Sequence, residues 1–394
     1  MLKEDWNYKT MKDICIVNQG LQINISQREK YKKNDNKVYI TIQHLNNIGE
    51  NEYIRNKDHN ESVVCNKNDI LMTRTGNTGK VVTNVEGVFH NNFFKVNFDR
   101  EKIDKDYLFY YLNMKSIQTL ILAKAGTSTI PDLNHNDFYS IPFIFPNNIK
   151  EQKAVVRILK DIDSLIRLLE NTIEKKKKIK NQAMMELMDI KNQKYKTITL
   201  NQIGYTYSGL SGMNSSNFTG GNKQYITFLN ILNNPVVKEE FFGKFHCDNI
   251  QNKVQKGDLF FNTSSETAEE VAMCATIDYD VENVYLNSFC FGFRINDKSV
   301  DNKYLAYFFR SQYGRNIMKT IAQGSTRFNL PKEKFLNYKI QIPEDINRQI
   351  EVTEILSNMD NEIEKLNIKL NKYKLIKEGM MEELLTGKVR LNYE

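Results

Sequence analysis

The chain has 394 residues, 40% hydrophobic and 26% charged, which is typical of a folded protein of two or three domains. Its net charge of +7 is compatible with nucleic acid or an acidic partner, and equally with an ordinary lysine-rich surface. The five cysteines form no CxxC pair, which argues against a zinc ribbon or a disulfide framework. No signal segment and no apolar run of roughly 20 residues is found, so we expect a cytoplasmic protein with no membrane partner.

The first half of the chain predicts a globular domain followed by a long helix. Short β-rich runs such as VYITI and FFKVNF, with a helix over 104–123, indicate an α/β domain over residues 1–147. A helical spacer follows over 148–191, because residues 150–188 contain neither glycine nor proline. About 38 residues at 1.5 Å each would make a helix of about 57 Å.

The second half repeats this order. The runs QYITFLNI, DLFF and FCFGFRI, with a helix over 301–322, predict an α/β domain over 192–342. A second helical spacer is predicted over 343–394. Both spacers close on similar phrases, AMMELM and GMMEELL, whose methionines suit either packing within the protein or docking of a partner.

Apolar residues in both spacers repeat with gaps of three and four, which is the spacing of a coiled-coil seam. Each seam residue of the second spacer lies 197 positions after its counterpart, as do Pro343 after Pro146 and Gln349 after Gln152. The predicted seam residues are Leu159, Ile162, Ile166, Leu169 and Ile173, then Leu356, Met359, Ile363, Leu366 and Leu370. We therefore predict an internal pseudo-two-fold duplication of the α+β class, in which two α/β domains are separated by two long helices that form an antiparallel coiled coil.

These phrases, in their order and spacing, resemble the DNA-specificity subunit of a type I restriction–modification system over essentially the whole chain. The resemblance rests on NDILMTRTG, GTSTIPDLN with PFIFPNNIKEQ, GDLFFNTSSETAEEV and the closing GMMEELLTGKVRL. It implies a non-catalytic, double-stranded-DNA-binding subunit of a bacterial defence complex, in which each globular domain is a target-recognition domain for one half of a bipartite site.

The same resemblance implies the partners and cofactors of the chain. The two helices would set the gap between the half-sites and dock two modification subunits, and restriction subunits would join that core. S-adenosylmethionine, ATP and Mg²⁺ are expected on the partner subunits, and no cofactor is expected in this chain. The alternative function is a coiled-coil scaffold whose globular heads bind protein.

The sequence predicts no catalytic or metal-binding residue. Pro131-Asp132 with Glu151-Gln152-Lys153 has the spacing of a PD…ExK nuclease, which needs carboxylates that converge on Mg²⁺. Glu151 and Lys153, however, fall in the first turn of the long helix, and the second half does not repeat the pattern. Residues 76–80 are too short for a phosphate-binding loop, and the five histidines show no ligand spacing.

The candidate DNA contacts are small polar loops at matching places in both halves. Arginine can fork onto guanine, asparagine can pair with adenine, and threonine, lysine and backbone N–H groups suit phosphate. The candidates are Thr73, Arg74, Thr75, Asn77, Lys80, Thr127 and Ser128 in the first domain, and Asn262, Thr263, Ser264, Ser265, Ser325, Thr326 and Arg327 in the second. Ordinary tight turns use the same residue types, and the recurrence in both halves favours a function in binding.

Overall fold

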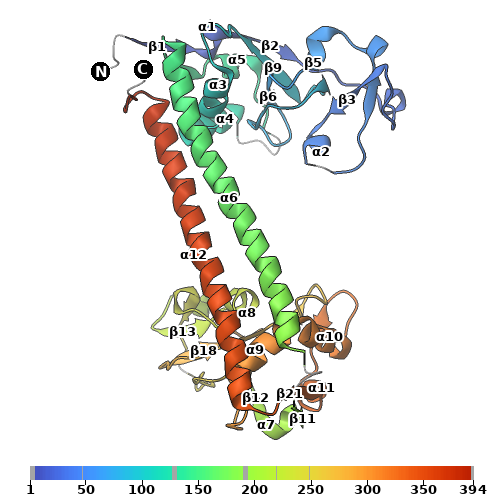
Figure 1. The fold of residues 1–394 in the computed structure, drawn as a ribbon, viewed down its shortest axis with the longest axis vertical. Helices are drawn as coiled ribbons and strands as arrows, with labels where there is room; N and C mark the ends of the chain where they lie inside the picture. Colours follow the sequence, from blue (N-terminus) through green and yellow to red (C-terminus); the bar gives the residue numbers. More distant parts are fainter. Residues whose placement is uncertain are drawn as a thin grey trace. The chain divides into compact units, whose positions relative to one another are not determined.

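The computed structural model describes residues 5–46, 48–126, 131–189, 194–218, 220–247 and 249–391. The chain divides into two compact units, Met1–Glu170 with Ile368–Glu394, and Asn171–Asn367. Each unit contains one globular domain and a part of each of two long helices, α6 (Ile149–Leu187) and α12 (Ile346–Leu384) (Figure 1).

The globular domain of the first unit consists of small sheets with short helices packed beside them. Its strands are β1 (Trp6–Thr10), β2 (Cys15–Gln19), β3 (Asn36–Ile40), β4 (Tyr53–Arg55), β5 (Val64–Cys65), β6 (Ile70–Thr73), β7 (Val81–Val82), β8 (Gly87–Phe89), β9 (Phe93–Phe98) and β10 (Pro142–Pro146). Its helices are α1 (Met11–Ile14), α2 (Ile42–Leu45), α3 (Lys105–Leu112), α4 (Lys115–Ala125) and α5 (His135–Tyr139), with 3-10 turns at Ile25–Gln27, Asn56–Asp58 and Glu61–Val63. The sheets have the strand orders β1-β10, β2-β9-β6-β7 and β4-β3-β8-β5.

The globular domain of the second unit follows the same plan. Its strands are β11 (Tyr195–Thr199), β12 (Gly204–Ser208), β13 (Lys223–Ile226), β14 (Phe242–Phe245), β15 (Leu259–Asn262), β16 (Ser264–Ser265), β17 (Cys274–Thr276), β18 (Val284–Leu286), β19 (Cys290–Ile295), β20 (Phe328–Asn329) and β21 (Lys339–Pro343). Its helices are α7 (Leu200–Ile203), α8 (Phe228–Asn233), α9 (Asn302–Arg310), α10 (Gln312–Ile321) and α11 (Lys332–Leu336), with 3-10 turns at Ser215–Phe218 and Glu239–Phe241. The sheets have the orders β11-β21, β12-β19-β15-β17, β14-β13-β18 and β16-β20.

The strand pairing confirms the internal duplication. In each domain the first strand of the domain pairs with the last, antiparallel, as β1 with β10 and β11 with β21. The order β2-β9-β6-β7 corresponds to β12-β19-β15-β17, and a parallel pair recurs as β3–β8 and β13–β18. The fully buried strands β6 and β15 each follow a turn closed by an aspartate, because Asp69 accepts a hydrogen bond from the Asn66 N–H (2.9 Å) and Asp258 from the Gln255 N–H (2.8 Å).

The duplicated glutamines make the same hydrogen bonds in both units. Gln152 accepts from the backbone N–H of Asp104, the N-cap of α3, and donates to the carbonyl of Pro146 at 3.0 Å. Gln349 accepts from the N–H of Asp301, the N-cap of α9, and donates to the Pro343 carbonyl at 2.9 Å. Both glutamine side chains are fully buried, so each long helix is joined to its domain by a satisfied buried amide.

The ends of the long helices belong to the domain cores. Val155 and Leu159 of α6, with Met381 and Leu385 at the end of α12, are buried in the core of the first unit. Met188, which follows α6, is buried in the core of the second unit, and Met184 packs against that core. Met188 and Met381 therefore serve as core packing, whereas Met185 is 40% exposed and stays available to a partner.

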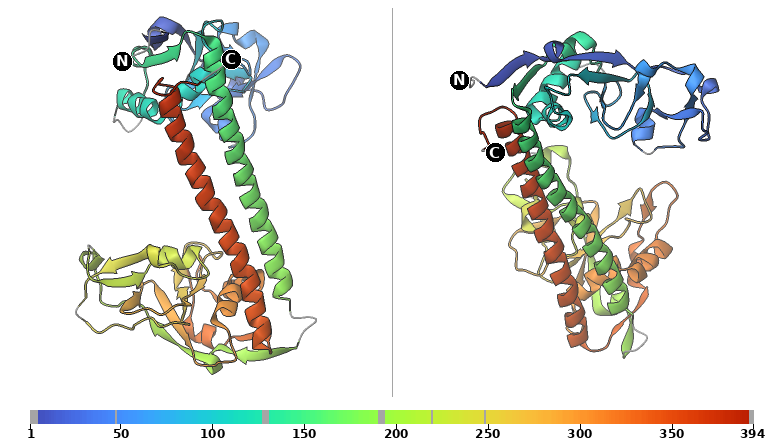
Figure 2. Two further views of the ribbon diagram at one scale, coloured as in Figure 1. Left: turned by 60° about the vertical axis from the view of Figure 1, so that its left-hand side comes forward. Right: turned by 45° about the horizontal axis from the view of Figure 1, so that its top comes forward.

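The two long helices lie side by side and antiparallel in each unit (Figure 2). In the first unit Lys377 and Lys374 of α12 pair with Asp163 and Glu170 of α6 at 2.6 and 2.8 Å. In the second unit Lys176 and Lys180 pair with Glu362 and Asp360 at 2.7 and 2.5 Å. Numbers rise on one helix as they fall on the other, which confirms the predicted antiparallel coiled coil.

The predicted seam lies between the helices and the cores. The five seam residues of α6 and three of α12 (Leu356, Ile363 and Leu370) are buried, while Met359 and Leu366 are half-buried. The exposed face of the pair is strongly charged, so burial of the seam accounts for the pairing. Within the described part of the chain, no helix combines the length and the apolar character that crossing a bilayer requires.

Candidate nucleic-acid interface

The structure brings the candidate loops of each domain together. In the first domain the loop that follows β6 contacts the segment 131–133, since the Leu133 N–H donates to the Arg74 carbonyl at 3.1 Å. In the second domain the Leu330 N–H donates to the Thr263 carbonyl at 2.9 Å. Strands β16 and β20 pair there as well. Segments far apart in the sequence thus form a polar edge in each domain, at the end of β6 in the first and at the end of β15 in the second.

A third segment, missed from the sequence, completes this edge. Residues 90–92 join β8 to β9, and the carbonyl of the last of them accepts from the Arg74 N–H at 2.6 Å. Residues 287–289 join β18 to β19, and the Phe289 carbonyl accepts from the Thr263 N–H at 2.9 Å. The two segments lie 197 positions apart, and this offset, shared with the helix seam, is the signal that could have revealed them.

We call this surface, of which each domain has its own, the loop edge. It is formed by residues 73–80, 90–92 and 131–133 in the first domain, and by residues 262–267, 287–289 and 324–330 in the second. Hydrogen bonds between its segments fix it on buried strands rather than leaving it as separate turns. Loops held in this way by a rigid scaffold are common positions for binding residues.

In each domain an arginine joins two segments of the loop edge. It lies on the loop after β6 in the first domain and on the segment after α10 in the second. Arg74, on the loop after β6, donates through Nε and Nη2 to both carboxylate oxygens of Asp132 at 2.7 and 2.8 Å. Arg327, after α10, donates through the same two nitrogens to the Ser264 hydroxyl at 3.2 and 3.0 Å. The hydrogen bonds from Arg74 lower the pKa of the Asp132 carboxyl, so this pair is ionised at neutral pH.

A half-buried polar contact joins α5 to β2 in the first domain. His135 of α5 contacts Gln19 at the end of β2, with 2.8 Å between Nε2 and Oε1. Burial and the nearby Arg74 lower the pKa of His135, which keeps its ring neutral at pH 7. Gln19 also donates to the Phe93 carbonyl at 3.3 Å, so this contact ties β2 to the start of β9.

Two of the predicted DNA contacts are corrected by the structure. Thr73 is fully buried, and its hydroxyl donates to the Asn77 carbonyl at 2.6 Å inside the loop. Asn262 is also fully buried, where its amide donates to the Glu270 carbonyl at 2.9 Å and accepts from the Met273 N–H. These side chains shape the loops because their polar groups are used within them, and neither reaches the surface.

The two serines of the second domain are also largely enclosed. Ser264 and Ser265 are each 9% exposed. Ser264 accepts from Arg327, and the Ser265 hydroxyl donates to the Glu270 carboxylate at 3.2 Å. Their hydroxyls therefore hold the loop edge together, and the exposed groups around them remain as candidate contacts.

The other predicted contacts lie at the surface of the loop edge. In the first domain Asn77 and Lys80 are exposed, and Thr75 is half-buried with its hydroxyl donating to Asn92 at 3.1 Å. Asn77 has a φ of 75°, a left-handed conformation that asparagine tolerates better than most residues. The exposed candidates of the second domain are Ser325, Thr326 and Arg327. Thr127 and Ser128 lie outside the described residues.

The nuclease-like spacing does not assemble into a site. Asp132 is engaged by Arg74, while Glu151 is almost fully buried and accepts from Arg390 at 2.9 and 2.7 Å. The two carboxylates thus have separate cationic partners. Among the described residues, no group of histidine, cysteine or acidic side chains is placed to hold a metal ion.

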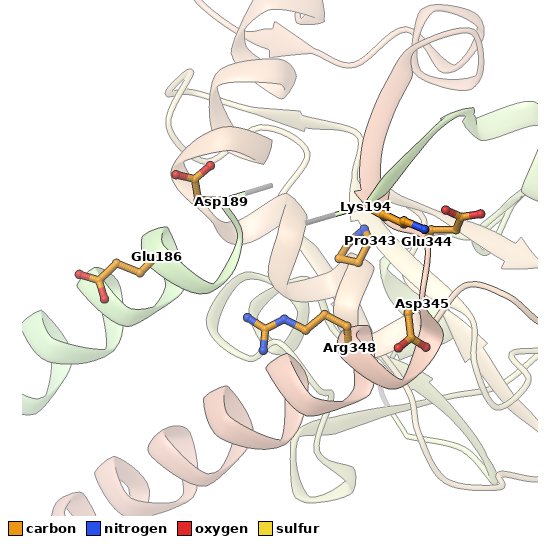
Figure 3. A pocket seen from close by; sticks show the side chains of 7 residues that line it. All are labelled: Glu186, Asp189, Lys194, Pro343, Glu344, Asp345 and Arg348. Atoms are coloured by element: carbon orange, nitrogen blue, oxygen red, sulfur yellow. The ribbon is translucent and has the colours of Figure 1, made fainter. Parts of the chain in front are cut away.

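An open pocket in the second unit also lacks the character of a cofactor site. Its lining residues are Glu186, Asp189, Lys194, Pro343, Glu344, Asp345 and Arg348. Figure 3 shows that these charged side chains spread apart instead of converging on one point. Acidic and basic groups are mixed there, which suits neither a phosphate nor a metal ion.

Comparison with known proteins decides what this duplicated architecture is. A family model described as the type I restriction modification DNA specificity domain matches residues 3–181 and again residues 190–372. The chain belongs to this family. Type I specificity subunits are non-catalytic and bind DNA, and the two globular domains are the target-recognition domains of this one. The alternative of a structural scaffold is therefore set aside.

Named relatives and solved structures are similar to this chain over nearly its whole length. The type I restriction enzyme MjaVIII specificity subunit of Methanocaldococcus jannaschii is 23% identical over 416 residues, covering 98% of this chain and 96% of that protein. The S subunit of a type I restriction–modification system from M. genitalium covers 98% of both chains with a TM-score of 0.57 and 16% identity. A chain from a structure on complex assembly and conformational transition of the type I system covers 99% of this chain and 100% of that chain, with a TM-score of 0.64 and 14% identity. These structures share the fold.

Proposed function

We propose that the loop edge of each target-recognition domain reads one half of a bipartite DNA site. The observation that carries this proposal is that one scaffold holds different side chains in the two domains. The segment 90–92 reads His-Asn-Asn where 287–289 reads Asn-Ser-Phe, and Arg74 follows β6 where Thr263 follows β15. A common scaffold with different exposed groups suits recognition of two different half-sites.

The exposed groups of the loop edge match the chemistry of base and phosphate contacts. Asn77 is exposed, and Asn91 and Asn92 are half-buried beside it. Their amides can pair with adenine in the major groove, and the exposed Lys80 suits a phosphate. In the second domain Arg327 suits guanine or phosphate, and Phe289, which is 60% exposed, suits a thymine methyl group or an unstacked base.

Single exposed apolar side chains within the charged face of the long helices support docking of modification subunits. On α6, Leu168 and Ile179 are 62% and 58% exposed and lie 11 residues apart, which places them on one face. On α12, Ile368 and Leu375 are 63% and 67% exposed and lie 7 residues apart, again on one face. We propose that two modification subunits cover these residues and that restriction subunits join the resulting core.

The remaining parts of the proposal concern spacing, cofactors and location. The helical spacers, assigned to residues 148–191 after the domain 1–147 and to residues 343–394 after the domain 192–342, set the gap between the half-sites. The partner subunits bind S-adenosylmethionine, ATP and Mg²⁺. The complex works where its DNA target lies, in the cytoplasm.

A matched pair of loop variants tests the reading of half-sites. In complex with the modification subunit, one variant replaces Thr75, Asn77 and Lys80 by alanine, and the other replaces Ser325, Thr326 and Arg327. Binding to duplexes with single-base changes should lose discrimination in one half-site for the first variant and in the other half-site for the second. The slope of log affinity against log salt should fall by about 1 for each lost phosphate contact. Unchanged discrimination in both variants, or an equal loss in both halves, would contradict the proposal.

A further inference from the structure

Two tyrosines at duplicated positions connect each domain to a long helix. Tyr110 of α3 donates its hydroxyl to Asp163 of α6 at 2.6 Å, and Tyr307 of α9 donates to Asp360 of α12 at 2.8 Å. Both tyrosines are nearly fully buried. Burial, together with the adjacent aspartate, raises the pKa of each phenol, so the hydroxyl stays protonated and remains a donor at neutral pH.

A lysine from the opposite long helix completes each contact. Lys377 of α12 lies 2.6 Å from Asp163, and Lys180 of α6 lies 2.5 Å from Asp360. The two ammonium groups also lie 5.5 and 5.6 Å from the ring centroids of Tyr110 and Tyr307. The three members of one set each lie 197 positions from those of the other, so the duplication repeats the whole arrangement. We call these sets the Tyr–Asp–Lys clusters.

Each cluster joins three elements at one point: a helix of the globular domain and both long helices. The apolar seam alone leaves the register of the long helices weakly fixed, because Leu and Ile side chains at successive seam positions replace one another readily. A slip of one heptad, about 10 Å, would separate the lysine and the tyrosine from the aspartate. Since the tyrosine is buried and the aspartate partly so, that slip leaves polar groups without partners, at a high cost.

The other ion pairs between the long helices lack these features. Lys374–Glu170 and Lys176–Glu362 join the same two helices, but their side chains are 34–56% exposed. Within the described ranges, no buried tyrosine hydroxyl contacts either pair. In the clusters the lysine and aspartate side chains are 18–29% exposed. Exposed pairs contribute little to stability or register, so they provide a natural control.

We propose that the two Tyr–Asp–Lys clusters are positioning groups. They fix the axial register of α6 against α12 and the position of each target-recognition domain on its part of the helix pair. In this way they restrict the length of the DNA gap that the complex accepts. This inference rests on the proposed function of the helices as spacers. In this proposal the choice of half-site belongs to the loop edge and not to the clusters.

The test measures gap selectivity, which is the ratio of methylation at the preferred gap to methylation at gaps one base pair shorter or longer. The complex with the modification subunit is assayed on duplexes that keep both half-sites and differ only in the gap. The variant Lys180→Met with Lys377→Met, and separately Tyr110→Phe with Tyr307→Phe, should lower this ratio by about tenfold. The control, Lys176→Met with Lys374→Met, should leave it unchanged.

A charge exchange covers the case in which the cluster variants fail to fold. Asp163→Lys with Lys377→Asp, combined with Asp360→Lys and Lys180→Asp, keeps an opposite-charge pair at each position and should restore assembly and part of the gap selectivity. If the exchanged chain recovers neither, or if the methionine and phenylalanine variants keep the wild-type ratio, the inference is wrong. Absence of any bipartite methylation by the wild-type complex would instead refute the proposed function itself.

Discussion

Arg74 has a structural role in its loop, and recognition of a base is its proposed second role. Its guanidinium is held flat against Asp132 by two hydrogen bonds, although 36% of the Arg74 side chain and 41% of the Asp132 side chain remain exposed. A pair this exposed contributes little to stability, because solvent screens it. We therefore expect that Arg74 can leave Asp132 for a guanine at small cost in free energy.

Substitution of either partner separates these two roles. Arg74→Ala should lose discrimination at one base of one half-site, by about 1–3 kcal/mol for a bidentate contact. Asp132→Asn should keep that discrimination, because it frees the arginine and removes a negative charge near DNA. Binding to duplexes with single-base changes measures this, with thermal unfolding as the control for folding. Equal loss of discrimination in both variants would show that the pair only holds the loop.

At the scale of elements, the helical part of the fold could be predicted from the sequence, whereas the loop edge could not. Heptad spacing in both helices, and the absence of glycine and proline from residues 150–188, predict α6 and α12, because a long helix is decided by local pattern. The burial of Thr73 and Asn262 depends on segments far away in the chain, which local composition does not report. The segments 90–92 and 287–289 were overlooked because a short polar turn has no distinctive residue type.

The exposed apolar residues of the helix pair give a prediction about assembly. Leu168→Lys combined with Ile368→Lys should reduce co-purification of the modification subunit by about tenfold or more, because a buried lysine replaces a large apolar contact. Helix content should stay unchanged, since both positions are exposed in the free subunit. Lys372→Ala, an exposed polar position on the same helix, is the matched control. Full recovery of the complex from the double lysine variant would place the docking surface elsewhere.

At the scale of the whole molecule, the duplication gives one chain two target-recognition domains, each joined to parts of the same two long helices. Each unit contains a globular domain, the start of the helix that follows it and the end of the other long helix, so neither half of the chain completes a unit alone. The satisfied amides of Gln152 and Gln349 and the two Tyr–Asp–Lys clusters repeat the same joints in both units. An arrangement of this kind suits a DNA site in two parts, as a symmetric dimer suits a palindrome.

The most direct test is methylation sequencing of DNA from cells that express this chain with its modification subunit. We predict one new methylated motif with two defined halves separated by a fixed number of unspecified base pairs. The alanine variant of Thr75, Asn77 and Lys80 should alter only one half of that motif. A single uninterrupted motif, or the absence of new methylation in cells that contain the assembled complex, would contradict the account.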